Sequence, residues 1–513
     1  MLDHLQVARS PALPAHLHES SVTQSFSLIV AILSHVICSP VSFVDSVQSH
    51  ATPGVLHHIP SSNKYLPLTS PYDDMAARNY TVKTHIFPGQ HIRHYAHATR
   101  SSEESVFQLQ AKQYIPRSNI PPSHGAITII ALPAGSFPKE ILEPLWDAFL
   151  THSKTNNFSI RSIWALDPST QAASGVLNES IQGDDPSIHD TARDVLCMVS
   201  AFRLEMPQPI IGFGHSLGGT AMLSLATMHP RLMASMILVD PTSGPSIQWA
   251  GGMLTFAASV RPDLWPSRKA AEKHFRKGGK AMSANWDPRC LDLFLRYGLR
   301  ETPTLLYPEA NKVTLKTSKA QEAWSYSQPC FELMDLGPGE PLSGRLEVKY
   351  TNLAPLDDRF AIFSGMPMMR TEGIDVDEAL PSIRPDVLYV FPEEGPLRSG
   401  YADKLARTGV GAGGSGGQRA GRIASETIAH AGHLVVMEKP AEVGKTVAEW
   451  LGQDVAKWAA RKEVEGKERD DKSVDGKQLA LSEKWMEQSF LLFQLVQQAK
   501  ERSKKQGKRA AKL

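Results

Sequence analysis

Cysteine is scarce in this chain. Only four of the 513 residues are cysteines, Cys38, Cys197, Cys290 and Cys330, and they lie far apart in the sequence. None belongs to a CxxC pair or to a Cys/His cluster with the spacing of a zinc site. We therefore expect free thiols in a reducing compartment rather than a disulfide framework.

An excess of charge of either sign is also missing. Lys and Arg number 54 and Asp and Glu number 53, so the chain as a whole has no field that would attract nucleic acid.

The acidic residues Asp184 and Asp185 are explained by helix capping. The glycine-rich stretch 408–422 lacks the preceding strand of a dinucleotide site. We expect no metal, no cofactor and no nucleic-acid partner.

The sequence has no long uninterrupted apolar run. Its best candidate, residues 25–44, is broken by His35 and Pro40, whereas a bilayer-spanning helix needs about 20 predominantly apolar residues. No stable membrane span is expected, and a secretory signal is the alternative reading of this segment. Residues 1–74 are rich in His, Ser and Pro, which predicts an irregular or disordered N-terminal extension.

Regular periodicity begins near residue 75. Residues 76–118 alternate apolar and polar side chains, which predicts antiparallel strands. Apolar strands then alternate with amphipathic helices. The predicted strands are 126–134, 161–167, 209–214 and 234–240, and the main helices are 139–153 and 189–205. This order predicts an α/β fold with a mostly parallel sheet covered by helices on both faces.

The β/α pattern stops after residue 240. It resumes with strands at 386–392 and 424–430 and a last helix near Pro440. The segment between is too long for a loop and contains helical stretches, so we predict a large helical cap at about 245–380, inserted into a domain of residues 75–455. Residues 456–513 are expected to form a charged linker, a helix and a basic tail. That helix carries Trp485, Phe490, Phe493 and Val496 at helical spacing, and it either docks on the body or binds a partner.

One motif carries the chemistry. Gly214-His215-Ser216-Leu217-Gly218 matches G-x-S-x-G, and a predicted strand enters it while a predicted helix leaves it. This context is typical of a nucleophile elbow, in which glycines allow a strained turn that presents the serine at a helix N-terminus. We therefore predict that Ser216 is a catalytic nucleophile.

An activated serine needs a base, which in this arrangement follows the last strand. His433, in ETIAHAGHLVVMEKP, lies there between a strand and a helix, and its imidazole can take and return the serine proton. His430, at the end of the strand, is interpreted as structural. Of the 19 histidines, His433 is the one whose place in the chain fits.

The acid that orients the histidine has two candidates. The turn after the strand 386–392 reads Pro392-Glu393-Glu394-Gly395, so the usual aspartate position falls on Gly395 and Glu394 is the nearest substitute. Asp240 ends the strand before the cap, which is the other position used. We favour Asp240 and keep Glu394 as the alternative.

The oxyanion hole is expected to use two backbone amides. The first is that of Leu217, directly after the nucleophile. The second should come from the loop Gly135-Ser136-Phe137 after the strand 126–134, and we choose Phe137 as the donor, with Ser136 next.

The chain ends in Ala511-Lys512-Leu513. A small residue, a basic residue and a leucine at the carboxyl terminus belong to the S-K-L class of peroxisomal addresses, which an import receptor reads. We therefore expect a peroxisomal location and an import receptor as partner.

These residues together resemble a family of fungal peroxisomal α/β-hydrolases that includes enzymes of host-selective toxin clusters such as the AK-toxin cluster. The matching stretches lie between about residues 80 and 451 and include AGSFPKEILEPLWDAF, GHSLGGTAMLSLATMHPRL, ILVDPT and HAGHLVVMEKP. The resemblance implies the α/β-hydrolase fold and an esterase, lipase or thioesterase-like enzyme that often assists secondary metabolism. It places the family's serine and histidine at Ser216 and His433. Similar proteins also lack a clear aspartate after the penultimate strand, which favours Asp240.

The chain departs from this family in its long N-terminal extension and in Ser136, where a glycine is expected. The function predicted from the residues is hydrolysis of an ester or thioester of a hydrophobic acyl group through an acyl-enzyme on Ser216. An acyltransferase that uses the same site and an inactive binding protein are the alternatives. The substrate is expected to be a small acyl compound.

Overall fold

The computed structural model describes residues 75–118, 122–123, 125–244, 247–276, 283–329, 368–470 and 480–510. The predicted extension 1–74 and the terminal Ala511-Lys512-Leu513 lie outside these residues. The chain divides into two compact units, Met1–Asp454 and Val455–Leu513, which are described separately.

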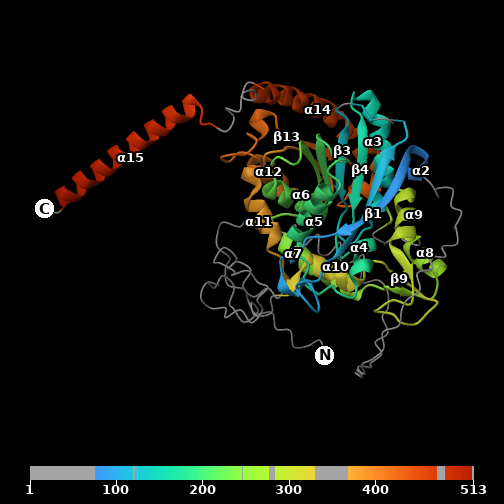
Figure 1. Ribbon diagram of the computed structural model, residues 1–513. Helices are drawn as coiled ribbons and strands as arrows, with labels where there is room; N and C mark the ends of the chain where they lie inside the picture. Colours follow the sequence, from blue (N-terminus) through green and yellow to red (C-terminus); the bar gives the residue numbers. More distant parts are fainter. Residues whose placement is uncertain are drawn as a thin grey trace. The chain divides into compact units, whose positions relative to one another are not determined.

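An eight-stranded sheet forms the centre of the first unit (Figure 1). Its strands, in spatial order, are β1 (Tyr80–Pro88), β2 (Gln108–Pro116), β4 (Ile160–Leu166), β3 (Ile127–Leu132), β5 (Ile210–His215), β6 (Ser235–Val239), β12 (Asp386–Pro392) and β13 (Ile423–Ile428). The pairs β1–β2 and β2–β4 are antiparallel, and all other neighbours are parallel. The predicted mostly parallel sheet is confirmed.

Helices cover both faces of this sheet, and every residue of β3, β5, β6 and β12 is therefore buried. Alternation along β5 separates the two faces. Phe213 packs against Trp146 of α3 (Glu143–Thr155), with ring centroids 5.6 Å apart. On the other face, a Cβ at Gly212 would meet Met222 of α6 (Leu217–Met228). The absent side chain at Gly212 therefore leaves room for α6.

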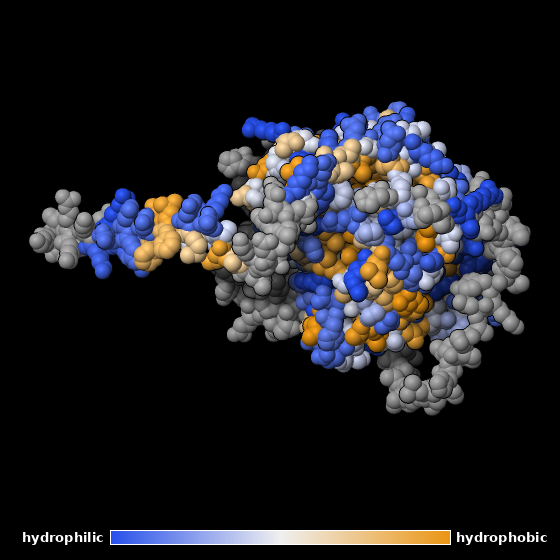
Figure 2. Space-filling model, turned by 45° about the horizontal axis from the view of Figure 1, so that its top comes forward, coloured by the Kyte–Doolittle hydropathy of each residue, from blue (hydrophilic) through white to orange (hydrophobic). Residues whose placement is uncertain are grey.

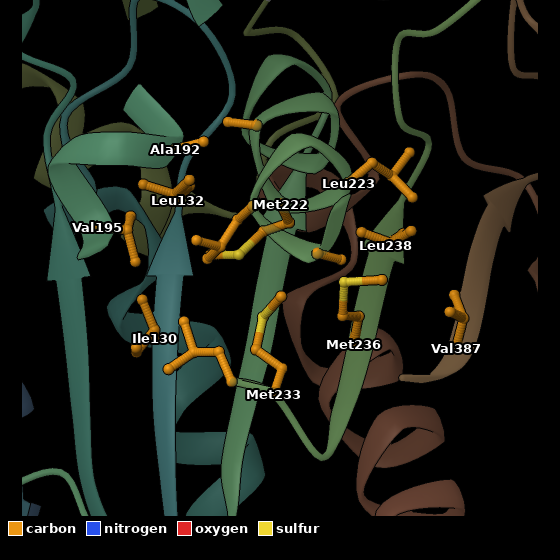
Figure 3. Packing of buried hydrophobic residues seen from close by; sticks show 14 of the residues in the cluster. Ile130, Leu132, Ala192, Val195, Met222, Leu223, Met233, Met236, Leu238 and Val387 are labelled. Carbon is orange, nitrogen blue, oxygen red and sulfur yellow. The ribbon is translucent and has the colours of Figure 1, made fainter. Parts of the chain in front are cut away.

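The apolar core on the α6 face is continuous across the parallel strands (Figure 3). Ile130 and Leu132 of β3 lie beside Ala192 and Val195 of α5 (Ile188–Ala201). The core continues through further residues of α6, β6 and β12, namely Met222, Leu223, Met236, Leu238 and Val387. Burial of this surface is the main force that holds α5 and α6 on the sheet.

The described residues of the inserted segment form helices, as predicted, and they also form two small sheets. Its helices are α7 (Ile247–Val260), α8 (Arg268–Arg276), α9 (Pro288–Tyr297), α10 (Lys319–Tyr326) and α11 (Glu372–Glu378). The strands β7 (Leu264–Trp265), β9 (Val313–Leu315) and β8 (Leu299–Glu301) form one antiparallel sheet, and β10 (Gln328–Pro329) pairs with β11 (Met368–Met369). Short strands thus accompany the helices of the predicted cap, and they are too short to show a period in the sequence.

The last helix is longer than the sequence suggested. α14 begins at Pro440, as predicted, but it continues to Asp470 and replaces the first part of the expected charged linker. In the second half of α14, where no side chain from 455 to 467 is buried, charged residues at helical spacing, such as the ion pair between Lys462 and Glu465, stabilise the helix. α15 (Glu483–Ala510) is the expected terminal helix, and Figure 2 shows an apolar band on it followed by hydrophilic surface toward its end.

None of the helices in the described ranges combines the length and the apolar character that crossing a bilayer requires.

The core of Figure 3 gives a test of stability. We predict that Ile130→Ala lowers the free energy of unfolding by about 2–5 kcal/mol, because Ile130 is fully buried and its loss leaves a cavity. The matched control is Ile86→Ala on β1, where the side chain is 56% exposed and the expected change is within about 0.5 kcal/mol. Urea unfolding of both variants measures the difference, and equal shifts would contradict this view of the core.

Candidate active site

Ser216 occupies a strained turn between β5 and α6. Its backbone has φ 55° and ψ −120°, a conformation that non-glycine residues rarely adopt. A Cβ at Gly214 would lie 2.5 Å from the carbonyl oxygen of Gly218, and a Cβ at Gly218 would lie 2.5 Å from that of Leu132. The turn is thus possible only with glycine at both positions, which is the geometry expected for a nucleophile elbow.

Three predicted residues meet in a line of hydrogen bonds. The Nε2 of His433 lies 2.9 Å from the Oγ of Ser216, and its Nδ1 lies 2.7 Å from the Oδ2 of Asp240. Asp240 is fully buried, Ser216 is 6% exposed, and the side chain of His433 is 27% exposed. Such a line lets the imidazole take a proton from the serine while the carboxylate fixes its orientation.

Asp240 lies against the imidazole of His433, and Glu394 does not. The Glu394 side chain is exposed, and its backbone amide donates to the carbonyl of Ala431 at 3.0 Å. Asp240 follows β6 with φ 40°, and its amide donates to the carbonyl of Val390 at 3.1 Å. Of the two candidates that the sequence left open, the structure brings only Asp240 to His433.

Tyr401 completes the surroundings of the acid. It opens α12 (Tyr401–Arg407), and its hydroxyl donates to the Oδ1 of Asp240 at 2.8 Å. Burial and the charge of Asp240 hold the pKa of Tyr401 well above its usual value, so the phenol remains a donor. A Cβ at Gly395 would lie 2.1 Å from this hydroxyl. The Tyr401 side chain therefore fills the space next to the turn where an acid was first sought.

The role of His215, the variable residue of the motif, was not predicted from the sequence. Its Nε2 lies 2.8 Å from the carbonyl oxygen of His433, and a carbonyl only accepts, so this nitrogen carries the proton. Burial, and then the neighbouring His433, lower the pKa of His215 to about 3. His215 is therefore neutral, and it holds the backbone of His433 without adding charge.

The carboxylate of Glu438 also stabilises the loop that contains His433. Glu438 of α13 (Val435–Glu438) accepts from the amide of Gly432 at 2.8 Å, and burial raises its pKa. His430 is largely exposed, and its amide donates to the Oε2 of Glu393 at 2.9 Å. No periodic pattern marks these contacts, so only the folded loop reveals them.

The oxyanion prediction is corrected in part. The amide of Leu217 is the first of α6, where amides have no partner in their own helix. The amide of Phe137 instead donates to the carbonyl of Ala134 at 3.3 Å, and that of Ser136 donates to the Oε1 of Gln171 at 2.7 Å. Of the two chosen donors, Leu217 is available and Phe137 is not.

Phe137 contacts the cap rather than the reaction centre. Its ring lies 5.5 Å from that of Trp286 and 6.1 Å from that of Phe294 in α9, measured between centroids. The amide of Asp287 donates to the carbonyl of Met437 at 2.8 Å. The cap is thereby joined both to the loop after β3 and to the segment after His433.

A small cavity of about 40 Å³ lies beside this arrangement. Gly135, Gln171, Leu217 and Ser325 line it together with residues 186–188. The described residues also contain no candidate metal site, because no group of three or more His, Cys, Asp or Glu side chains among them is placed to hold a metal ion.

Known proteins resemble this chain over most of its length. It is 34% identical over 440 residues to the type I acyl-CoA thioesterase mpaH′ of Penicillium brevicompactum, which covers 80% of this chain and 95% of that protein. The abhydrolase domain-containing protein AFT2-1 of Alternaria alternata is 27% identical over 289 residues, which covers 55% of this chain and 98% of that protein.

The fold is shared with a solved structure. The peroxisomal α/β-hydrolase Lpx1 of Saccharomyces cerevisiae superimposes with a TM-score of 0.53 at 16% identity, over 74% of this chain and 90% of that one. Residues 162–294 also match the family model described as serine aminopeptidase, S33. The α/β-hydrolase fold and the predicted resemblance to fungal hydrolases are confirmed. The chain belongs to the α/β-hydrolase family that includes these fungal thioesterases, and it is a hydrolase.

Proposed function

We propose that this hydrolase cleaves the thioester of a hydrophobic acyl group, with Ser216 as nucleophile, His433 as general base and Asp240 as the residue that orients it. The observation that carries the proposal is the unbroken line of hydrogen bonds from the Oγ of Ser216 through the imidazole to the buried carboxylate. A serine in a structural turn would need neither a base nor an acid.

The first half of the reaction forms an acyl-enzyme. The Oγ of Ser216 attacks the acyl carbonyl carbon while the Nε2 of His433 takes its proton. The carbonyl oxygen becomes an oxyanion, which the amide of Leu217 and the positive end of α6 stabilise. The carbon–sulfur bond then breaks, and the imidazolium returns its proton to the departing thiol.

The second half releases the acid. A water molecule gives a proton to the Nε2 of His433 and attacks the acyl carbon of the ester on Ser216. The Ser216–acyl bond breaks, the carboxylic acid leaves, and the serine recovers its proton. Asp240 orients the imidazole and stabilises the imidazolium, because its two oxygens accept from His433 and Tyr401.

The relatives suggest the class of substrate. Proteins that share a third of their residues with this chain are named type I acyl-CoA thioesterases, and the names of others are those of Alternaria abhydrolase-domain proteins. We infer a CoA thioester as the substrate and a role in fungal secondary metabolism. The inserted segment is partly apolar, as in α7 with the sequence IQWAGGMLTFAASV, which suits an apolar acyl group.

Ser216 and His433 are tested by covalent labelling and turnover. Ser216→Ala should abolish labelling by a fluorophosphonate and hydrolysis of acyl-CoA, while the fold is retained. His433→Ala should cost nearly as much, because members of a triad act as a unit. Turnover by Ser216→Ala above about a tenth of the wild-type rate would refute the assignment of the nucleophile. Absence of labelling in the wild-type protein would favour an inactive binding protein.

The acid is tested by a matched pair of amide substitutions. Asp240→Asn should lower kcat by roughly 10³–10⁴, since the imidazole loses the carboxylate that fixes its tautomer. Glu394→Gln should leave kcat within a few-fold, because its exposed side chain is not bonded to His433. Steady-state kinetics on one acyl-CoA compares the two, and the reverse ranking would move the acid to the later turn.

The location is tested at the carboxyl terminus. If Ala511-Lys512-Leu513 is a receptor-read address, deletion of Lys512 and Leu513 should make a fluorescently tagged protein cytosolic without changing its esterase activity. Deletion of residues 1–74 should alter neither location nor activity. A wild-type protein that enters the secretory route, or a truncated one that remains peroxisomal, would overturn the peroxisomal proposal.

A further inference from the structure

The short segment that carries the acid has a strained backbone. Residues 240–244 follow β6 and lead toward α7, and we call them the acid turn. Asp240 has φ 40° and Gly244 has φ 100°, and a non-glycine residue rarely adopts a positive φ. Such a conformation persists only where the surrounding structure fixes it. The contacts of the acid turn therefore decide where the carboxylate of Asp240 lies.

Contacts from the body hold the first part of the acid turn. The amide of Asp240 donates to the carbonyl of Val390 at 3.1 Å, and the amide of Thr242 donates to the carbonyl of Ser216 at 3.4 Å. The hydroxyl of Thr220 in α6 donates to the carbonyl of Thr242 at 2.6 Å. The acid turn is thus bonded to the nucleophile residue itself, so a shift of the turn changes the geometry of the triad.

The helix α12 supplies two further donors to the same turn. Tyr401 donates to the Oδ1 of Asp240, and the Nζ of Lys404 donates to the carbonyl of Ser243 at 2.7 Å. Tyr401 and Lys404 are three residues apart, so they lie on one face of the helix. This face of α12 therefore contacts the acid turn at both Asp240 and Ser243.

Lys404 is buried, which is uncommon for a lysine. The residue is 5% exposed, and lysines are almost never fully buried unless they are paired. Burial lowers the pKa of Lys404, whereas the carboxylates of Asp377 and Asp240 act against that effect. A buried ammonium group costs free energy, and the bond to the Ser243 carbonyl and the nearby carboxylates offset this cost. The contacts of Lys404 thus explain its presence better than packing alone.

α12 is itself fixed to the sheet. The ring of Tyr401 stacks on that of Phe391 in β12, with centroids 3.8 Å apart. Just after the helix, the hydroxyl of Thr408 lies 2.9 Å from that of Tyr389, also in β12. Because both ends of α12 are attached to β12, the helix is a firm support for the two donors that reach the acid turn.

We propose that Lys404 is a positioning residue, which acts with Tyr401 to hold the acid turn and so to place Asp240 against His433. The Nζ of Lys404 is bonded to a backbone carbonyl rather than to a triad side chain, so it acts through the turn. Without it, the strained turn would relax, and the 2.7 Å contact between Asp240 and His433 would be lost for part of the time. The inference rests on the proposed reaction and goes beyond it, because it adds a residue that the triad does not include.

Lys404→Met removes the donor and fills the same space with an apolar chain of similar length. The kcat for an acyl-CoA and for a p-nitrophenyl ester should both fall about tenfold, the effect of losing a hydrogen bond from a charged group, with KM within about twofold. Each kcat is divided by the amount of serine that a fluorophosphonate labels at completion, so unfolded protein does not count. Lys445→Met on α14, where the side chain is 60% exposed, is the matched control and should behave as wild type.

Two further variants keep the test decisive. If Lys404→Met does not fold, Lys404→Gln replaces it, because its amide ends one bond short of the Nζ and the same loss of kcat is expected. Tyr401→Phe keeps the ring stack and should also lower kcat about tenfold. Since both side chains act on one turn, the double variant should lose less than the product of the two single losses. Losses that multiply would contradict the joint action.

The outcomes distinguish positioning from a purely structural role. A lower unfolding temperature with unchanged kcat per labelled serine would show that Lys404 only stabilises the fold, and it would overturn the inference. A raised KM with unchanged kcat would also overturn it, because Lys404 would then act on substrate binding. A wild-type protein that is neither labelled nor active would instead refute the proposed function, and the inference with it.

Discussion

The arrangement of the site depends on one buried carboxylate. Asp240 is withdrawn from water, and a buried charge is tolerated only when its oxygens are hydrogen-bonded. His433 and Tyr401 satisfy one oxygen each, which fixes the position of the loop after β13 and of the start of α12. Because β5, β6, β12 and β13 are parallel neighbours, their carboxyl ends bring serine, acid and base to one edge of the sheet. His215 then links the elbow to the histidine loop.

The features that could be predicted from the sequence are those that a local sequence pattern marks. Ser216 and His433 could be chosen because strand, glycine and helix signals surround them. The choice between Asp240 and Glu394 stayed open because it depends on the order of strands in space, which no single segment encodes. Phe137 was misassigned as a donor because the local motif does not show that its amide closes a turn and that its ring packs on the cap. The extent of α14 was missed because charged residues, rather than an apolar face, mark its second half.

The cap contributes Ser325 to the wall of the small cavity beside Leu217, and it contacts two loops of the body. Trp286 packs on the loop after β3, while Asp287 is bonded to the segment that follows His433. A single inserted segment thus touches both the loop near the oxyanion site and the segment that follows His433.

The close approach of Gly395 and Tyr401 has a consequence for how such sites evolve. The hydroxyl of Tyr401 occupies the volume that any side chain at residue 395 would enter, and the same hydroxyl satisfies the acid on β6. An aspartate at 395 would clash with the Tyr401 hydroxyl unless the tyrosine moved, and loss of the tyrosine would leave an oxygen of Asp240 unsatisfied. Glycine at the turn and tyrosine six residues later should therefore be inherited together. We expect to find that pair in other chains whose triad acid lies on the earlier strand.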